Sequence, residues 1–317
     1  MDYIRGVLGI LVLVIFASIF STNRKNIDWR LVGIGILLQA IFGILITKVA
    51  FVAAIFTKVS AAFVKFLSFS EQGAQFIFGD LATSSFGFIF AFQVLPTIIF
   101  FSTVSAGLYY LGVLQKVVFV IAWVMARTMR LSGPESLSAA GNIFLGQTEA
   151  PLLVKPFISK MSRSELMCLM TGGMATIAGG VLAGYVAFLG GDDPVEKTRF
   201  ATYLLGASIM NAPAAIVISK IIIPEEKERK LDEHLDISGQ VPDVNLIDAM
   251  SRGASEGLRL ALNVGAMLLA FIAVIAALNY LLSGIIGEFL GLNTLVVSST
   301  NGTFTGFSLE YLLGQVF

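Results

Sequence analysis

The stretch that decides the fold is GPESLSAAGNIFLGQTEAPLLVKPFISKM, residues 133–161. It lies in a very apolar chain, yet it carries Asn142 and the polar run GQTEAP at residues 146–151. Two apolar arms, residues 136–145 and 150–158, flank that run. Each arm is shorter than the ~20 apolar residues that a membrane-spanning helix needs. Short arms that meet at a polar tip marked by Gly and Pro predict a re-entrant helical hairpin.

The predicted tip contains a carboxylate, Glu149. Irregular backbone at membrane depth is tolerated only where it is buried in protein or lines a water-filled cavity. An uncompensated carboxylate there costs several kcal/mol, so an intramembrane Glu149 is predicted to belong to a binding site. The alternative is that GQTEAP is an ordinary surface loop between two helices.

The composition is that of a membrane protein. The 317 residues are 56% hydrophobic and 13% charged, and the mean hydropathy is +0.86. Soluble domains carry about 25% charged residues. The formal net charge is zero, which gives no basic surface for nucleic acid. Cys168, the single cysteine, excludes an intramolecular disulfide, and His234 lies in a charged segment typical of a solvated loop.

The sequence therefore predicts an all-α polytopic membrane protein with about six transmembrane helices, one re-entrant hairpin and interfacial amphipathic helices. Lys58 and Lys65 lie seven residues apart among apolar residues, which favours a helix along the membrane surface. Residues 116–130 form a second such candidate. The first apolar run is interpreted as a retained helix rather than a signal peptide. The expected spans are residues 4–20, 31–46, 94–114, 165–189, 200–223 and 258–282.

Five regions are expected along the chain. They are N-terminal spans with an interfacial helix, a scaffold span with an amphipathic helix, half of a transport domain, a charged cytoplasmic loop, and a scaffold span with a C-terminal stretch. Their bounds are residues 1–92, 93–131, 132–223, 224–247 and 248–317.

The distribution of Lys and Arg predicts the orientation. If the first connector faces the cytoplasm, the cytoplasmic segments hold fifteen of these residues and the external segments six. This count favours an external N-terminus in a cell (inner) membrane. It also favours a hairpin that enters and leaves on the same side.

Two spans carry signals of an interrupted helix. In MTGGMATIAGGVLAGY, Thr176 precedes Gly179 and Gly180, so local unwinding there would free backbone carbonyls. Close helix packing alone is the alternative reading of these glycines. In the next span, Asn-Ala-Pro at residues 211–213 is expected to break the helix midway.

These polar groups indicate transport rather than catalysis. Transporters build substrate and ion sites from half-helix hairpins beside unwound helices. Residues 147–149 offer donors and acceptors for a planar solute, and Asn142 and Thr176 offer hard oxygen ligands for a cation such as Na+. An enzyme is disfavoured because HExxH, a nucleophile elbow and paired intramembrane aspartates are missing from the sequence. A structural or signalling protein would not need a buried polar tip.

Longer motifs resemble the concentrative nucleoside transporter family. They are NRKNIDWR (23–30), FAFQVLPTIIFFSTVSAGLYYLGVLQ (90–115), GNIFLGQTEAPLLVKPF (141–157), SELMCLMTGGMATIAGGVLAGY (164–185), NAPAAIVISKIIIPE (211–225) and GASEGLRLALNVGAMLLAFI (253–272). The resemblance covers nearly the whole chain. It points to the sodium-coupled bacterial branch, because the tip of the proton-coupled branch reads closer to GQSEN.

The resemblance implies a nucleoside site. Gln147, Thr148 and Glu149 match the hairpin residues that hydrogen-bond the nucleobase. Val181, in the following span, matches a residue that packs on the base.

The resemblance also implies a Na+ site, with Na+ as coupling ion and no other cofactor. Asn142 and Thr176 match side-chain ligands, while Leu145 and Ile177 match positions that donate backbone carbonyls. Leu145 replaces a valine and Thr176 a serine, and both changes are compatible with these roles.

The expected function is nucleoside import by sodium symport, in a homotrimer that works by an elevator motion within the lipid bilayer. One departure qualifies it: the family continues with a second hairpin carrying an Asn-Glu-Phe motif and with further helices. These are missing from the sequence in hand, so residues 1–317 alone are expected to insert without transporting. The alternatives are an inactive fragment, half of a split transporter, or proton-coupled uptake.

Overall fold

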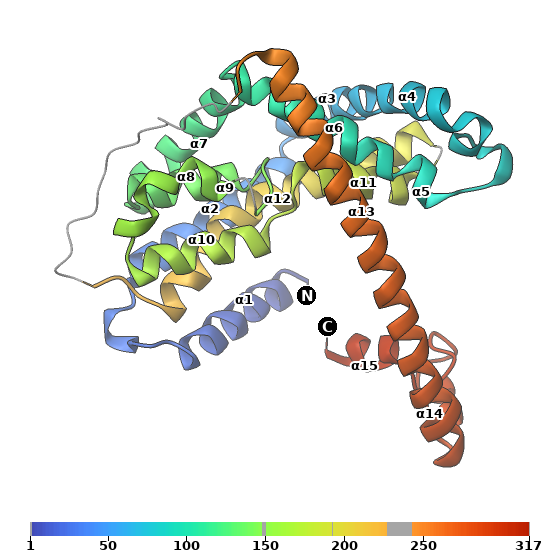
Figure 1. The fold of residues 1–317 in the computed structure, drawn as a ribbon. Helices are drawn as coiled ribbons and strands as arrows, with labels where there is room; N and C mark the ends of the chain where they lie inside the picture. The colour runs from blue at the N-terminus through green and yellow to red at the C-terminus, as the bar shows by residue number, and fades with distance from the viewer. Residues whose placement is uncertain (1, 148–149, 192, 227–242, 317) are drawn as a thin grey trace. The chain divides into compact units, whose positions relative to one another are not determined.

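A computed structural model describes residues 2–147, 150–191, 193–226 and 243–316 of the chain. Within these ranges every regular element is helical (Figure 1). The chain divides into two compact units, residues 1–258 and 259–317. Each unit is described by itself.

The first unit begins with seven helices that are joined by short connections and single helical turns. They are α1 (Asp2–Ile19), α2 (Trp29–Lys48), α3 (Ala50–Leu67), α4 (Phe69–Phe78), α5 (Phe90–Gln93), α6 (Leu95–Tyr110) and α7 (Val113–Met129). α2 begins where it does because the Asp28 carboxylate accepts hydrogen bonds from the amides of Arg30 and Leu31, at 2.9 and 3.2 Å.

The central part of the chain contains shorter helices and one long helix. They are α8 (Gly133–Gly141), α9 (Ala150–Leu153), a 3₁₀ helix (Lys155–Lys160), α10 (Arg163–Ala175), α11 (Gly179–Gly190) and α12 (Pro194–Ile222). Ser162 and Glu165 form a reciprocal capping box that fixes the start of α10. Asp193 caps α12 by accepting a hydrogen bond from the Val195 amide at 2.8 Å.

The described residues include six helical segments that are long and apolar enough to cross a membrane. α1 is a shorter apolar helix, so its predicted span is not among the six. The sequence predicts that α3 and α4 lie along the membrane surface. Together they form one of the six segments, so length and composition are compatible with a membrane-spanning as well as a surface position. The six segments are Trp29–Lys48, Ala50–Ala82, Phe90–Tyr110, Arg163–Gly190, Pro194–Ile222 and Leu246–Gly287.

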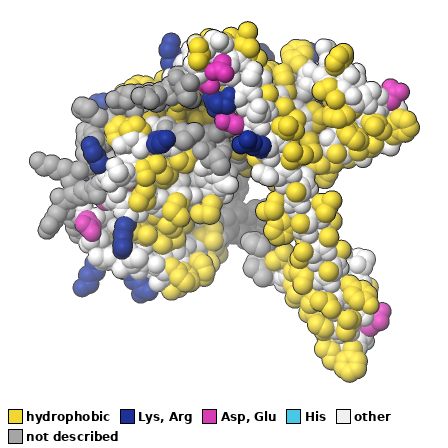
Figure 2. Space-filling model, in the orientation of Figure 1, with side chains coloured by type: hydrophobic (Ala, Val, Ile, Leu, Met, Phe, Trp, Pro, Cys, Tyr) yellow, Lys and Arg dark blue, Asp and Glu magenta, His cyan; other side chains and the backbone are white. Residues whose placement is uncertain are grey.

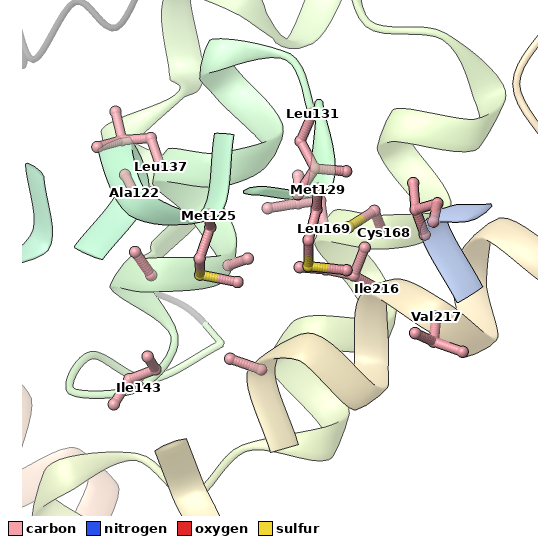
Figure 3. Packing of buried hydrophobic residues seen from close by; sticks show 14 of the residues in the cluster. Ala122, Met125, Met129, Leu131, Leu137, Ile143, Cys168, Leu169, Ile216 and Val217 are labelled. Atoms are coloured by element: carbon pink, nitrogen blue, oxygen red, sulfur yellow. The ribbon is translucent and has the colours of Figure 1, made fainter. Parts of the chain in front are cut away.

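α12 is the central helix of the first unit. It packs against α2, α3, α10 and α11 (Figure 1). More than half of its most apolar stretch is buried, a larger share than in any of the other five segments. Its side chains Ile216 and Val217 meet Leu169 of α10 and Met129 of α7 in one hydrophobic cluster (Figure 3). The core therefore joins α12 to α7, α8 and α10.

Glycines allow two helix pairs in this unit to approach closely. A Cβ at Gly35 of α2 would lie 2.2 Å from a side-chain carbon of Val217. Gly253 and Gly257 lie on α13 (Leu246–Asn279), where a Cβ would lie 2.7 Å and 2.9 Å from backbone atoms of Ser102 and Ile99 in α6. Such contacts are typical of helix pairs in membranes.

The second unit contains the remainder of α13, a stretch of wide helical turns (Tyr280–Gly287), α14 (Leu292–Ser299) and α15 (Leu309–Val316). The Asn293 amide joins these pieces, because it donates to the Ser283 carbonyl and accepts from the Phe307 amide, each at 2.9 Å. Large hydrophobic side chains cover most of the face of this unit that Figure 2 presents.

The structure differs from two expectations, the helix break at residues 211–213 and the length of the first hairpin arm. The prediction that Asn211-Ala-Pro213 breaks its span is wrong, because α12 continues through Pro213. Near the proline, Gln39 of α2 donates a hydrogen bond to the Met210 carbonyl at 3.2 Å. The first apolar arm, expected over 136–145, is helical only to Gly141.

Candidate functional site

The candidate site begins where α8 ends. All nine residues of α8 are buried, including the polar Ser136 and Ser138. The chain then turns tightly, because the amides of Phe144 and Leu145 both bond to the Gly141 carbonyl, at 3.1 and 2.8 Å. The Ala150 amide bonds to the Gly146 carbonyl at 3.0 Å. A tight, irregular turn thus follows a fully buried half-helix.

A second irregular segment separates α10 from α11. Thr176 has extended backbone angles, φ −104° and ψ 157°, and α11 begins only at Gly179. The unwinding predicted after Thr176 is therefore confirmed. The Gly179 amide, freed from the helix, donates to the Phe144 carbonyl at 3.1 Å. The break and the turn after α8 are joined directly by this bond.

α12 supplies two more polar contacts to these irregular segments. The buried Ser208 hydroxyl donates to the Ile143 carbonyl at 3.2 Å, and the Asn211 amide donates to the Ala175 carbonyl at 2.8 Å. Sequence reasoning assigned no site role to either residue. The sequence does mark Asn211 as a polar side chain two residues before a proline, but this pattern predicts a helix break rather than a contact with another segment.

Asn142 is the most unusual group at the site. Its side chain is 1% exposed, yet neither the amide oxygen nor the amide nitrogen has a hydrogen-bond partner among the described residues. A buried polar group without a partner costs about 1–3 kcal/mol. An amide oxygen is also a hard ligand suited to Na+. The Asn142 amide oxygen is therefore a suitable ligand for the Na+ that the sequence predicts there.

Two glycines of α10 make room for this amide. A Cβ at Gly172 would lie 3.0 Å from the Asn142 amide nitrogen. A Cβ at Gly173 would lie 2.9 Å from Cβ of Gln147 and 3.9 Å from the Asn142 amide oxygen. Both tip residues thus lie against the last turn of α10. Gly172 is also the residue whose carbonyl accepts the Thr176 hydroxyl, at 2.8 Å.

The other predicted site residues are placed as follows. Leu145 is buried in the turn, and Ile177 is half-buried in the break. Val181 is half-buried in the first turn of α11, and Gln147 is exposed. Thr148 and Glu149 lie outside the described residues. The structure thus brings the Asn142 and Gln147 side chains to the end of α10, just before the Thr176–Ala178 break, and leaves the ligand roles of all eight as predictions.

Three family models match this chain in sequence. They are described as the N-terminus of the Na+ dependent nucleoside transporter (residues 8–81), nucleoside recognition (91–192) and the C-terminus of the Na+ dependent nucleoside transporter (203–317). Together with the helical fold, they define a multi-pass membrane transporter rather than an enzyme.

Relatives and solved structures agree with these models. The chain is 41% identical to YutK, an uncharacterized transporter of Bacillus subtilis, over 100% of this chain and 73% of that protein. It is 41% identical to sodium/nucleoside cotransporter 1 of Mus musculus, over 87% of this chain and 41% of that protein. The chain belongs to the family of Na+-dependent nucleoside transporters.

The fold is similar to that of CNTnw in two states. The inward-facing, substrate-bound structure has a TM-score of 0.85 and 37% identity, and covers 100% of this chain and 71% of CNTnw. A variant in an outward-facing state has a TM-score of 0.83 and 36% identity, and covers 98% of this chain and 70% of that one.

Proposed function

We propose that this chain carries out nucleoside import by sodium symport, with alternating access. The observation that carries the proposal is the buried Asn142 amide, which has no partner among the described residues and is set against Gly172 and Gly173 at the end of a helix that then unwinds. Transporters place coupling ions beside such unwound helices. Family membership and the likeness to both inward- and outward-facing CNTnw support the same function.

The proposed Na+ site uses oxygen ligands from two segments. The Asn142 and Thr176 side chains supply two oxygens, and the carbonyls of Leu145 and Ile177 supply two more. The support is the Gly179–Phe144 hydrogen bond, which ties the segment of Ile177 to the turn that contains Leu145. Na+ is a hard cation that prefers such ligands.

The proposed nucleoside site lies next to the Na+ site on the same turn. Gln147, Thr148 and Glu149 hydrogen-bond the nucleobase, and Val181 packs on its ring. The exposure of Gln147 and the position of Val181 in the first turn of α11 are consistent with access from a cavity. Because the proposed substrate and ion ligands share the segment 142–149, binding of one favours the geometry that the other requires.

The remaining parts of the proposal concern assembly and placement. We propose a homotrimer in the cell (inner) membrane with an external N-terminus, in which the half of the transport domain over 132–223 moves as an elevator relative to scaffold helices. α12 packs against both α10 and α11 within the proposed moving half.

The test is uptake of radiolabelled uridine by a host without nucleoside uptake, with the protein expressed from its own gene. Replacing Na+ with choline should abolish accumulation of intact uridine. Glu149→Gln should abolish it while protein remains in the membrane, because losing a hydrogen bond to a charged group costs about 1.5–3 kcal/mol.

The matched control is Glu196→Gln, the same substitution at an exposed pair with Arg199, which should transport like wild type. Uptake driven by a pH gradient and indifferent to Na+ would identify a proton-coupled transporter instead. Wild-type uptake by a well-expressed Glu149→Gln variant would contradict the proposed nucleoside site.

A further inference from the structure

A second polar cluster lies at the opposite end of the helices that bear the candidate site. Its centre is an ion pair between Glu135 of α8 and Lys220 of α12. The Glu135 side chain is 0% exposed and the Lys220 side chain 7%. Charges are almost never buried this deeply unless they are paired. Neither residue has a role in the proposed substrate or ion site.

Lys220 reaches further elements from the same position. Its ammonium donates to the Ser164 hydroxyl of α10 at 3.0 Å and lies 3.1 Å from a carboxylate oxygen of Glu225. The Ser162 hydroxyl donates to the same Glu225 oxygen at 3.0 Å. Lys220 thus connects α8, the start of α10 and the chain that leaves α12.

The same three helices are cross-linked again at the site. There the Ser208 hydroxyl of α12 bonds to the turn after α8, and Asn211 bonds to the Ala175 carbonyl at the end of α10. Along α12, Ser208 and Lys220 are twelve residues apart, which is about 18 Å of helix. Two polar cross-links at this separation fix both the position of α8 along its neighbours and its rotation.

We propose that Lys220 is a positioning residue, which acts through its ion pair with Glu135 to hold α8 so that Asn142 faces Gly172 and Gly173. This inference rests on the proposed sodium symport. Seven residues, about two helical turns, separate Glu135 from Asn142. A rotation or shift of α8 at its base therefore displaces the amide at its end. Removing Lys220 leaves the buried Glu135 carboxylate without its cation, whereas Glu135→Gln leaves Lys220 paired with Glu225.

The test compares single and paired substitutions in the protein expressed from its own gene. Lys220→Met alone should raise the half-saturating Na+ concentration for uridine uptake at least tenfold, and Glu135→Gln alone should raise it by a smaller factor because Lys220 keeps Glu225 as a partner. Glu135→Gln combined with Lys220→Met should return it to within threefold of wild type. A merely structural role would lower the amount of folded protein and the maximal rate without moving the half-saturating Na+ concentration.

The matched control is Arg199→Gln, which removes a cation from an exposed pair on the same helix. It should leave the half-saturating Na+ concentration unchanged. A Lys220→Met variant with the wild-type Na+ dependence would overturn the inference. So would a paired variant as impaired as Lys220→Met, because the pair would then not be the acting unit.

Cys168 gives a readout that does not depend on transport. It is buried in the cluster with Leu169 and Ile216 (Figure 3), close to Glu135 and Lys220. Maleimide labelling in native membranes should be at least tenfold faster in Lys220→Met than in wild type and return to the wild-type rate in the paired variant.

If wild type shows no Na+-dependent uptake, the proposed function fails, and the labelling rates still decide whether the pair holds α8. Equal labelling rates in all four proteins would overturn that positioning role.

Discussion

The sequence predicts an interruption in two membrane segments, one over α10 and α11 and the other over α12. Of these two, the structure interrupts the segment of α10 and α11. It unwinds over Thr176–Ala178, where the chain has no proline. α12 contains Pro213 and continues through it. Proline in a helix interior costs about 3 kcal/mol or more, so intrinsic propensity alone gives the opposite result.

The backbone groups that unwinding frees at the α10–α11 break have partners on other segments. The Phe144 carbonyl accepts the Gly179 amide, and the Ala175 carbonyl accepts the Asn211 side-chain amide. Near Pro213, Gln39 of α2 donates to the Met210 carbonyl while the helix stays intact. A membrane helix can unwind where neighbouring segments satisfy the freed groups, and a strong helix breaker is not required.

The largest expected effect comes from closing the space at the break. A Cβ at Gly179 would lie 2.4 Å from the Phe101 ring and 2.8 Å from the Phe144 carbonyl oxygen. Gly179→Ala should therefore lower the free energy of unfolding by about 1–3 kcal/mol, as overpacking does. Thermal unfolding in detergent measures this change.

The control is Gly33→Ala in α2, where nothing lies within 4 Å of the added carbon. It should be neutral or slightly stabilising, because Ala is favoured over Gly within helices. Equal unfolding temperatures for the two variants would show that the α10–α11 break is not tightly packed.

The next largest effect comes from removing the side chain that supports the break. Asn211→Leu leaves the Ala175 carbonyl without its donor, at a cost of about 1–3 kcal/mol. We expect a higher half-saturating Na+ concentration for uridine uptake. Gln39→Leu removes the corresponding donor near Pro213 and should affect stability without changing the Na+ dependence. Identical Na+ dependence in both variants would remove the distinction between the two helices.

The smallest effect is expected at the proline itself. Pro213→Ala restores a backbone donor to a helix that is already continuous, so uptake should remain at the wild-type level. Loss of uridine uptake by a stable Pro213→Ala variant would show that the proline has the functional role that its sequence context predicted.

The sequence predicts the fold class because long apolar runs specify membrane helices without reference to their neighbours. It also predicts the unwinding after Thr176, where glycines make the backbone permissive. It cannot place Ser208 or Asn211, since each bonds to a carbonyl on another segment. Lys220 shows the same limit: it looks like the basic end of a span, and only the packing of α8 against α12 reveals its pairing with Glu135.

We propose that the turn after α8 and the break after α10 form one sodium-coupled site. The most direct measurement is the Na+ dependence of uridine uptake by wild type and by Asn142→Ala. The variant removes an amide oxygen from a space that Gly172 and Gly173 keep open. Losing about 1.4 kcal/mol of ion binding corresponds to a tenfold change.

We expect Asn142→Ala to raise the half-saturating Na+ concentration about tenfold, with the maximal rate approached at high Na+. An unchanged Na+ dependence in a variant that transports normally would contradict it.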